Sequence, residues 1–507
     1  MNATLESQRF NCHSFEHEQS LAVLPDGPDG PDGPDGNVYA RFGCYHHHTE
    51  KLARTSGIRR ISGIRRIRRN ERIGMSNFGF GPGDFLNAAR GKNNSELITL
   101  DALRESSRTF IAAHEIIPVG STDVSQMKEA LELAELWLDD VTVFPSTNSS
   151  NDVAWSRREW LDNSLAGWQK MVEPLAEGMA TALSTVLTEM TQQLGGSNPE
   201  GMDAETSNEV RDAIAENLGL PQGFPMGGFS VEAINPIMRG FMGSLVATQL
   251  GLSVGGLALK ITGSHDVSLP LFTKPGTHLI PQNIKEWVKD LDIEEREVTY
   301  FLALREAAAA RLFAHTPWLT QYIQDCMTQY GKGIRIDVES IQRQAEDAMA
   351  SGELDINNPA SINIAINQGM FMPETTQQQA SALEKLEMAL ALIEGWVDHV
   401  VTMAAKDRLP AFISLQEMQR RSRATNSPSQ QLFATLLGLE VSPRKTRECS
   451  IFWGELVALA TQELPEGIKI RDHRWEDSAL LPTLKDLADP EGFIRSTTVP
   501  DDLSGLL

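Results

Sequence analysis

The feature that most constrains the fold is the helical spacing of apolar residues over long segments of the chain. In residues 294–314 and 377–405, apolar side chains recur every three or four positions, which places them on one face of a helix. Strand signals are few, and the clearest is a short extended stretch around residues 278–280. We therefore expect a mainly α protein. Three earlier segments show the same helical period: residues 97–115, 123–140 and 156–190.

The first 74 residues differ from the rest of the chain. Residues 25–36 repeat Pro-Asp-Gly four times, and residues 57–69 read GIRRISGIRRIRR, so neither stretch can bury a core. Residues 1–74 hold 11 Lys+Arg and 9 Asp+Glu, a net charge of +2, which leaves −25 for residues 75–507. We predict a disordered, low-complexity extension, translated from a wrongly chosen start upstream of Met75. The alternative is a basic arm that binds RNA or an acidic surface.

The charge and the cysteines restrict the setting in which the protein works. A net charge of −23 repels nucleic acid and anionic membranes, so neither is expected as a partner. The four cysteines lie far apart without a CxxC pair, which is typical of a reducing compartment. The chain opens without an apolar leader segment, so we expect a cytoplasmic protein.

One uncharged run of twenty residues, 240–259, has the length of a membrane span. Its five glycines and its polar residues, including Gln249, lower its hydrophobicity, and no second span of this kind accompanies it. We therefore interpret this run as a buried helix pair in a large core.

Four charged residues fall on or beside the apolar faces of the two long predicted helices. Arg305 lies inside the apolar stripe of residues 294–314, and Glu306 lies at its margin. Glu394 and Asp398 are four residues apart in the second helix, on one face and close to its apolar stripe. Two carboxylates near a buried face need a cation beside them, which can be a metal, an arginine or a lysine.

The segments around these charges resemble one known family. TYFLALREAAAARLFAHTPWL, with LALIEGWVDHVV much later in the chain, resembles the actinobacterial zincin-like metallopeptidase family, whose members are described as zinc-dependent metalloproteases or hydrolases. The similarity extends over most of residues 75–507 and includes SRREWLDNSLAGWQKMVEPL and ATQLGLSVGGLALKITGSHDVSLPL. The resemblance implies one large zincin-like helical domain over residues 75–507, with zinc as the cofactor.

The resemblance also assigns roles to residues of this chain. A zincin places HExxH on one helix, where two histidines bind zinc and the glutamate activates water. In the glutamate-type branch, a second helix supplies ExxxD, whose Glu is the third ligand. Glu306 is thereby the candidate general base, Glu394 the candidate metal ligand, and Asp398 the residue that orients a ligand. The two histidine positions are occupied by Arg305 and Ala309.

Two classes of function stay open at this point. As an enzyme, the protein is a zinc-dependent hydrolase, in which Glu394 and Asp398, with a distant histidine such as His315, form a compromise site; His399 is adjacent but points elsewhere on the helix. As a non-enzyme, it is a helical scaffold that binds a peptide or protein. In that case the Arg305 guanidinium replaces the metal and bridges Glu394 and Asp398.

Overall fold

The architecture described below is that of a computed structural model. The structure describes residues 96–147, 152–195, 231–274, 276–289, 291–335, 376–426, 430, 432–433, 445–460 and 463–497. The chain divides into two units, Met1–Met75 and Ser76–Leu507, and every described residue lies in the second. The predicted extension over residues 1–74 therefore lies outside the described residues, and its boundary stays a prediction.

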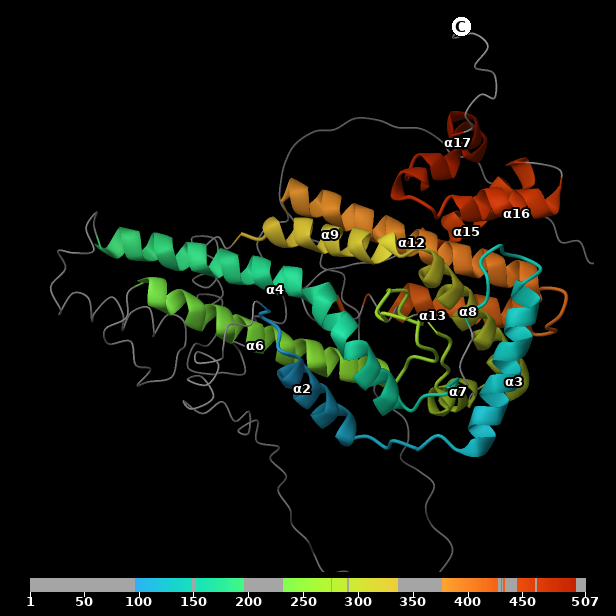
Figure 1. Cartoon of the computed structure of the whole chain (residues 1–507), viewed down its shortest axis with the longest axis horizontal. Coiled ribbons are helices and arrows are strands. Elements are labelled where there is room, and N and C mark those ends of the chain that lie inside the picture. Colours follow the sequence, from blue (N-terminus) through green and yellow to red (C-terminus); the bar gives the residue numbers. More distant parts are fainter. Residues whose placement is uncertain are drawn as a thin grey trace, which may run out of the picture. The chain divides into compact units, whose positions relative to one another are not determined.

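The described residues are mainly helical, as predicted. They contain isolated β-bridges but no named strand. Two short 3₁₀ helices, Ser478–Leu480 and Asp486–Ala488, follow the main helices near the end of the chain. The α-helices are α2 (Leu100–Ala112), α3 (Ser121–Leu138), α4 (Arg157–Gly195), α6 (Val231–Ala258), α7 (Pro281–Val288), α8 (Glu295–His315), α9 (Trp318–Lys332), α12 (Gln377–Ala405), α13 (Phe412–Asn426), α15 (Thr446–Ala460), α16 (Leu464–His473) and α17 (Pro490–Thr497) (Figure 1).

Helices α8 and α12 lie inside the core and pack against each other. On its other sides α8 contacts α3, while α12 contacts α9 and α15 (Figure 1). The middle of α8 is buried on all sides, which explains why its alanines continue around the helix and are not confined to one face. Both predicted helices are confirmed, α8 to within one residue at each end and α12 at both ends.

The start of α12 has a local cause. Thr376 is its N-cap, and its hydroxyl accepts a hydrogen bond from the Gln379 amide at 3.2 Å. The Gln379 side chain in turn accepts one from the Thr376 amide at 2.9 Å, which completes a capping box. By length and composition alone α12 could cross a membrane, but 78% of its apolar window is buried inside the protein. That burial is typical of a central core helix.

The uncharged run 240–259 belongs to a single helix, α6, and not to a pair of helices. The helix packs against α2 and runs alongside α4 (Figure 1). Gly251 allows the close approach to α2, because a Cβ atom there would overlap the Ser106 hydroxyl. The small residues of the run therefore serve contacts inside the core.

The loop between α6 and α7 brings three extended segments together. Leu279 forms a parallel bridge with Ala154 and an antiparallel bridge with Gly263, which confirms the short extended stretch predicted around residues 278–280. The Ser264 amide donates to the His278 carbonyl at 2.9 Å, and the Ile280 amide donates to the Thr262 carbonyl at the same distance. These bonds fix residues 262–268, which face α8 and α12, without a regular sheet.

Candidate functional site

The predicted site residues come from two helices that pack together. Arg305 and Glu306 lie on α8, while Glu394 and Asp398 lie on α12, and each of the four is at most 9% exposed. The structure does not gather them into one cluster. It separates them into three neighbouring polar groups, centred on Glu394, Asp398 and Glu306.

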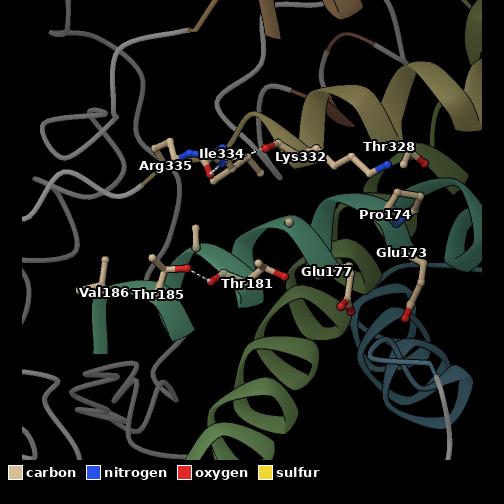
Figure 2. A pocket seen from close by; sticks show the side chains of 13 residues that line it. Glu173, Pro174, Glu177, Thr181, Thr185, Val186, Thr328, Lys332, Ile334 and Arg335 are labelled. Atoms are coloured by element: carbon tan, nitrogen blue, oxygen red, sulfur yellow. Dashed lines mark hydrogen bonds between the residues drawn. The ribbon is translucent and has the colours of Figure 1, made fainter. Parts of the chain in front are cut away.

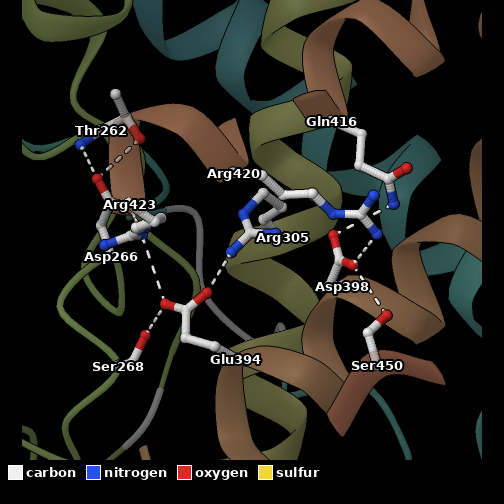
Figure 3. Close-up of polar contacts among 10 residues, drawn as sticks. All are labelled: Thr262, Asp266, Ser268, Arg305, Glu394, Asp398, Gln416, Arg420, Arg423 and Ser450. Carbon is white, nitrogen blue, oxygen red and sulfur yellow. Dashed lines mark hydrogen bonds and ion pairs between the residues drawn. The ribbon is translucent and has the colours of Figure 1, made fainter. Parts of the chain in front are cut away.

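The Glu394 carboxylate is held by two arginines and one serine (Figure 3). Arg305 donates from Nη2 to Oε2 at 2.7 Å, and Arg423 of α13 lies 3.6 Å from Oε1. The Ser268 hydroxyl donates to the same Oε1. Burial by itself raises the pKa of Glu394, but attraction to Arg423 and Arg305 outweighs it and leaves the pKa lowered. Glu394 is therefore a carboxylate whose charge is already compensated.

Asp398 has a separate set of partners (Figure 3). Its Oδ2 accepts from Arg420 at 2.6 Å and from the Ser450 hydroxyl at 2.9 Å, while Oδ1 accepts from Gln416 at 3.2 Å. The predicted guanidinium bridge is therefore only half present, because Arg305 binds Glu394 and Arg420 binds Asp398. The two acids are one helical turn apart: α8, α13 and residues 262–268 supply the partners of Glu394, whereas α13 and α15 supply those of Asp398.

Glu306 points into the loop between α6 and α7. Its carboxylate accepts hydrogen bonds from the Ser264 hydroxyl, from the His265 amide at 2.9 Å and from the His278 amide at 3.3 Å. The His265 ring places Nδ1 2.9 Å from Oε1. Gly263 permits this approach, because a Cβ atom there would overlap the carboxylate. Burial favours a raised pKa for Glu306, but attraction to His265 and these hydrogen bonds leave it lowered.

Ser264, His265 and Glu306 are not arranged as a catalytic triad. In a triad the acid binds one imidazole nitrogen and the serine binds the other. Here Nδ1 of His265 lies 3.1 Å from the Ser264 hydroxyl and 2.9 Å from Glu306, so the same nitrogen faces both groups. Ser264 is also fully buried. This geometry anchors the loop to α8 and does not activate a nucleophile.

Asp266 and Ser268 connect the loop to the arginines. Asp266 forms an ion pair with Arg423 through Oδ1, and its Oδ2 accepts from the Thr262 amide at 2.8 Å. Ser268 has a backbone φ of 58°, in the left-handed region that non-glycine residues rarely adopt. That backbone conformation belongs to the residue whose hydroxyl reaches Glu394.

The sequence interpretation did not identify the residues that neutralise the site. His265, Asp266, Ser268, Arg420 and Arg423 fall in no spacing rule that connects them to α8 or α12. The only available signal was the density of polar residues in ITGSHDVSLP, within one of the segments that carried the family resemblance.

His315, considered as a distant ligand, and His399, the neighbour of Asp398 in the chain, have other environments. His315 is the last residue of α8, where its Nδ1 lies 2.8 Å from the Arg311 carbonyl and its ring stacks on Phe144. Burial and the nearby charge of Arg471 lower the pKa of His399 to about 3, so its imidazole stays neutral. The His399 ring lies against Gly454 of α15.

The residues present do not fit a zinc ion. Zinc needs at least three protein ligands, yet Arg305 and Ala309 occupy the histidine positions, and the Glu394 carboxylate is bound by guanidinium and hydroxyl groups. In the part of the chain that the structure describes, no three His, Cys, Asp or Glu side chains could hold a metal. The cavity between Arg305, Glu306 and Glu394 measures about 20 Å³, which is room for one water molecule.

A much larger cavity, of about 850 Å³, lies between α4 and α9 (Figure 2). None of the predicted site residues lines it. Of its acidic residues, Glu173 accepts hydrogen bonds from the amides of Leu97 and Ile98, and Glu177 forms an ion pair with Arg239 at 2.6 Å. These carboxylates already serve contacts between helices, so the cavity offers no chemistry that matches the predicted site.

The residues between Glu394 and Asp398 have structural roles. A Cβ atom on Gly395 would lie 2.5 Å from the Cys449 Cβ, so glycine allows α15 to pack closely on α12. Trp396 is fully buried, and its indole donates to Asp472 at 3.0 Å. The motif EGWVD therefore holds two helices together as well as presenting two acids.

Helices α8 and α12 bring Glu306, Glu394 and Asp398 to the interior of one helical domain. The family model described as zincin-like metallopeptidase matches residues 101–494. The chain belongs to this family. Zinc binding is a property that the family implies, whereas this chain's own residues at the motif do not provide a zinc site.

Two further comparisons add little. A search of curated proteins finds no match. One solved structure, described as a "putative hydrolase with a novel fold" from Chloroflexus aurantiacus, is similar with a TM-score of 0.47 and 16% sequence identity. The similarity covers 79% of this chain and 98% of that one.

Proposed function

We propose that this protein is a metal-free, non-catalytic member of the zincin-like metallopeptidase family, which acts by binding a peptide or protein. The observation that carries the proposal is the buried ion pair between Arg305 and Glu394, at 2.7 Å, at the two positions where the resemblance to zincins implies a histidine and a glutamate on the metal. The guanidinium takes the place of the cation, because it supplies positive charge and hydrogen-bond donors to the same carboxylate.

The candidate general base supports the same proposal. In a metallopeptidase, the glutamate of HExxH must reach a metal-bound water. Glu306 instead accepts hydrogen bonds from Ser264, His265 and the His278 amide. The adjoining 20 Å³ cavity is far below the volume of roughly 300 Å³ or more that a ligand pocket occupies. The carboxylate is therefore used to hold the loop against α8.

The proposal is tested by measuring zinc in the full-length protein after purification and dialysis, by elemental analysis. We expect no zinc that depends on Glu394. The matched control is the double variant Arg305→Met/Glu394→Gln, which removes both partners of the ion pair. Zinc held elsewhere, for example by the histidine run 46–48, stays in both proteins, and its presence in both leaves the proposal standing.

Two results would overturn the proposal. One is stoichiometric zinc in the natural protein that is lost in the Arg305→Met/Glu394→Gln variant. The other is hydrolysis of an unstructured protein substrate such as casein that disappears in the Glu306→Gln variant while the circular dichroism spectrum is unchanged. Either result would restore the hydrolase interpretation, with Glu394 as ligand or Glu306 as general base.

A further inference from the structure

Helix α13 supplies arginines to both acids of the ExxxD segment. Arg420 and Arg423 are three residues apart and lie on one face of α13. Arg420 binds Asp398 at 2.6 Å, whereas Arg423 pairs with Asp266 and lies 3.6 Å from Glu394 (Figure 3). One helix therefore covers the acidic face of α12 with two permanent cations.

The two halves of α13 are attached in different ways. The N-terminal half is anchored by apolar burial, since Phe412 and Leu415 are almost fully buried and the Phe412 ring packs edge-on against Phe301. Within residues 416–423, the buried side chains are those of Gln416 and Gln419, and both are polar. Hydrogen bonds and ion pairs connect this part of α13 to α12. We call residues 416–426 the arginine strap.

Hydrogen bonds and ion pairs of this kind fix the position of a helix but add little to the free energy needed to separate it from its neighbours. Separating a buried ion pair returns both ions to water, so their mutual attraction is largely offset by hydration. Segments with few buried apolar contacts are the ones that open locally at low free-energy cost. The strap meets this condition, whereas the N-terminal half of α13 and the middle of α12 do not.

Arg423 also separates two cavities. Together with Thr262 and Asp266, it lines both the 20 Å³ cavity beside Glu394 and a pocket of about 350 Å³ on its other side, between α7 and α13. Its side chain thus lies between the two spaces, beside the carboxylates of Asp266 and Glu394.

We propose that the arginine strap opens as a unit from the acidic face of α12 while the N-terminal half of α13 stays docked. In the closed state, its arginines neutralise Asp398, Glu394 and Asp266. In the open state, the acids of α12 become accessible, with Arg305 alone left on Glu394. The strap is therefore a built-in conformational device at the former metal position.

Hydrogen–deuterium exchange of the full-length protein, read by mass spectrometry, tests this inference. In the natural protein, we expect residues 416–426 to exchange at least ten times faster than residues 386–401 of α12. In the Arg420→Gln/Arg423→Gln variant, we expect a further rise of about tenfold in the strap, with residues 386–401 unchanged. The matched control is Arg421→Gln, because Arg421 is 78% exposed and pairs with Glu417; it should change strap exchange by less than twofold.

A charge-conserving variant keeps the test decisive if the glutamine variant does not fold. Arg420→Lys/Arg423→Lys retains both positive charges, so we expect strap exchange within about threefold of the natural protein. The inference is wrong if the strap and α12 exchange together in the natural protein, which shows that they open only with the whole fold. It is also wrong if the lysine variant exchanges as fast as the glutamine variant, because charge is then not what closes the strap.

Discussion

Glu306 and Glu394 are both buried carboxylates with lowered pKa values, but different kinds of groups stabilise them. Glu306 is surrounded by a hydroxyl, two backbone amides and the imidazole of His265, all from the loop between α6 and α7. Glu394 is bound by guanidinium groups from α8 and α13, with one serine. Glu306 is held by one loop, through hydrogen bonds and the imidazole of His265, whereas Glu394 is held by the permanent charges of arginines from two helices.

The difference shows two ways in which this fold accommodates a buried carboxylate. Hydrogen bonds from a loop can hold a single carboxylate next to a histidine, as they do at Glu306. The acids of α12 lie close together on one helix, so they require positive charge that stays at every physiological pH. Three arginines from two helices supply it: Arg305, Arg420 and Arg423.

The largest effect should come from breaking the charge balance at Glu394. We expect Arg305→Ala to lower the free energy of unfolding by about 3–5 kcal/mol, because it leaves a buried carboxylate without its nearest cation. The double variant Arg305→Met/Glu394→Gln removes both charges and should recover most of that loss. Urea denaturation followed by circular dichroism measures both. Equal losses in the single and the double variant would show that packing, and not charge balance, dominates at this position.

An effect of intermediate size concerns acid stability. A carboxylate whose folded pKa is lowered stabilises the protein above its unfolded pKa, and this stability is lost as the pH falls through the folded value. Below about pH 4, the natural protein should therefore lose stability as both glutamates protonate. Glu306→Gln should be less stable at pH 7, by on the order of 2 kcal/mol, and lose less on acidification. Thermal melts between pH 7 and pH 3 measure how steeply the stability of each protein falls with pH. An equally steep fall in the natural protein and in Glu306→Gln would contradict the prediction.

The smallest effect separates the hydroxyl of Ser268 from its backbone conformation. Ser268→Ala removes the hydrogen bond to Glu394 and keeps a side chain at a φ of 58°. Ser268→Gly removes the same bond but relieves the left-handed backbone, so it should be more stable than the alanine variant by about 1 kcal/mol. Chemical denaturation of the two variants side by side gives the difference. An alanine variant as stable as the glycine variant would show that the backbone at this position is unstrained.

The sequence predicted the helices and one ion pair of the site, for reasons that are local. Helical periodicity predicts α12, and the position of Arg305 inside an apolar stripe indicates that it needs an acidic partner. The partners of Asp398 and Glu306 could not be predicted. Arg420 is 22 residues from Asp398, His265 is 41 residues from Glu306, and no helical period relates them. Only the packing of α13 and of the loop after α6 brings them together.

The division of charges among three arginines has a consequence for building a zinc site into this chain. An HExxH motif on α8 would need histidines at both 305 and 309, yet Arg305→His alone removes a cation from a buried glutamate and supplies only one metal ligand. Even with both histidines, Arg423 remains 3.6 Å from the glutamate that must reach the metal. Each single substitution is therefore unfavourable by itself, because the metal site is complete only after the last one. The arginine network therefore opposes the construction of a zinc site by one substitution at a time.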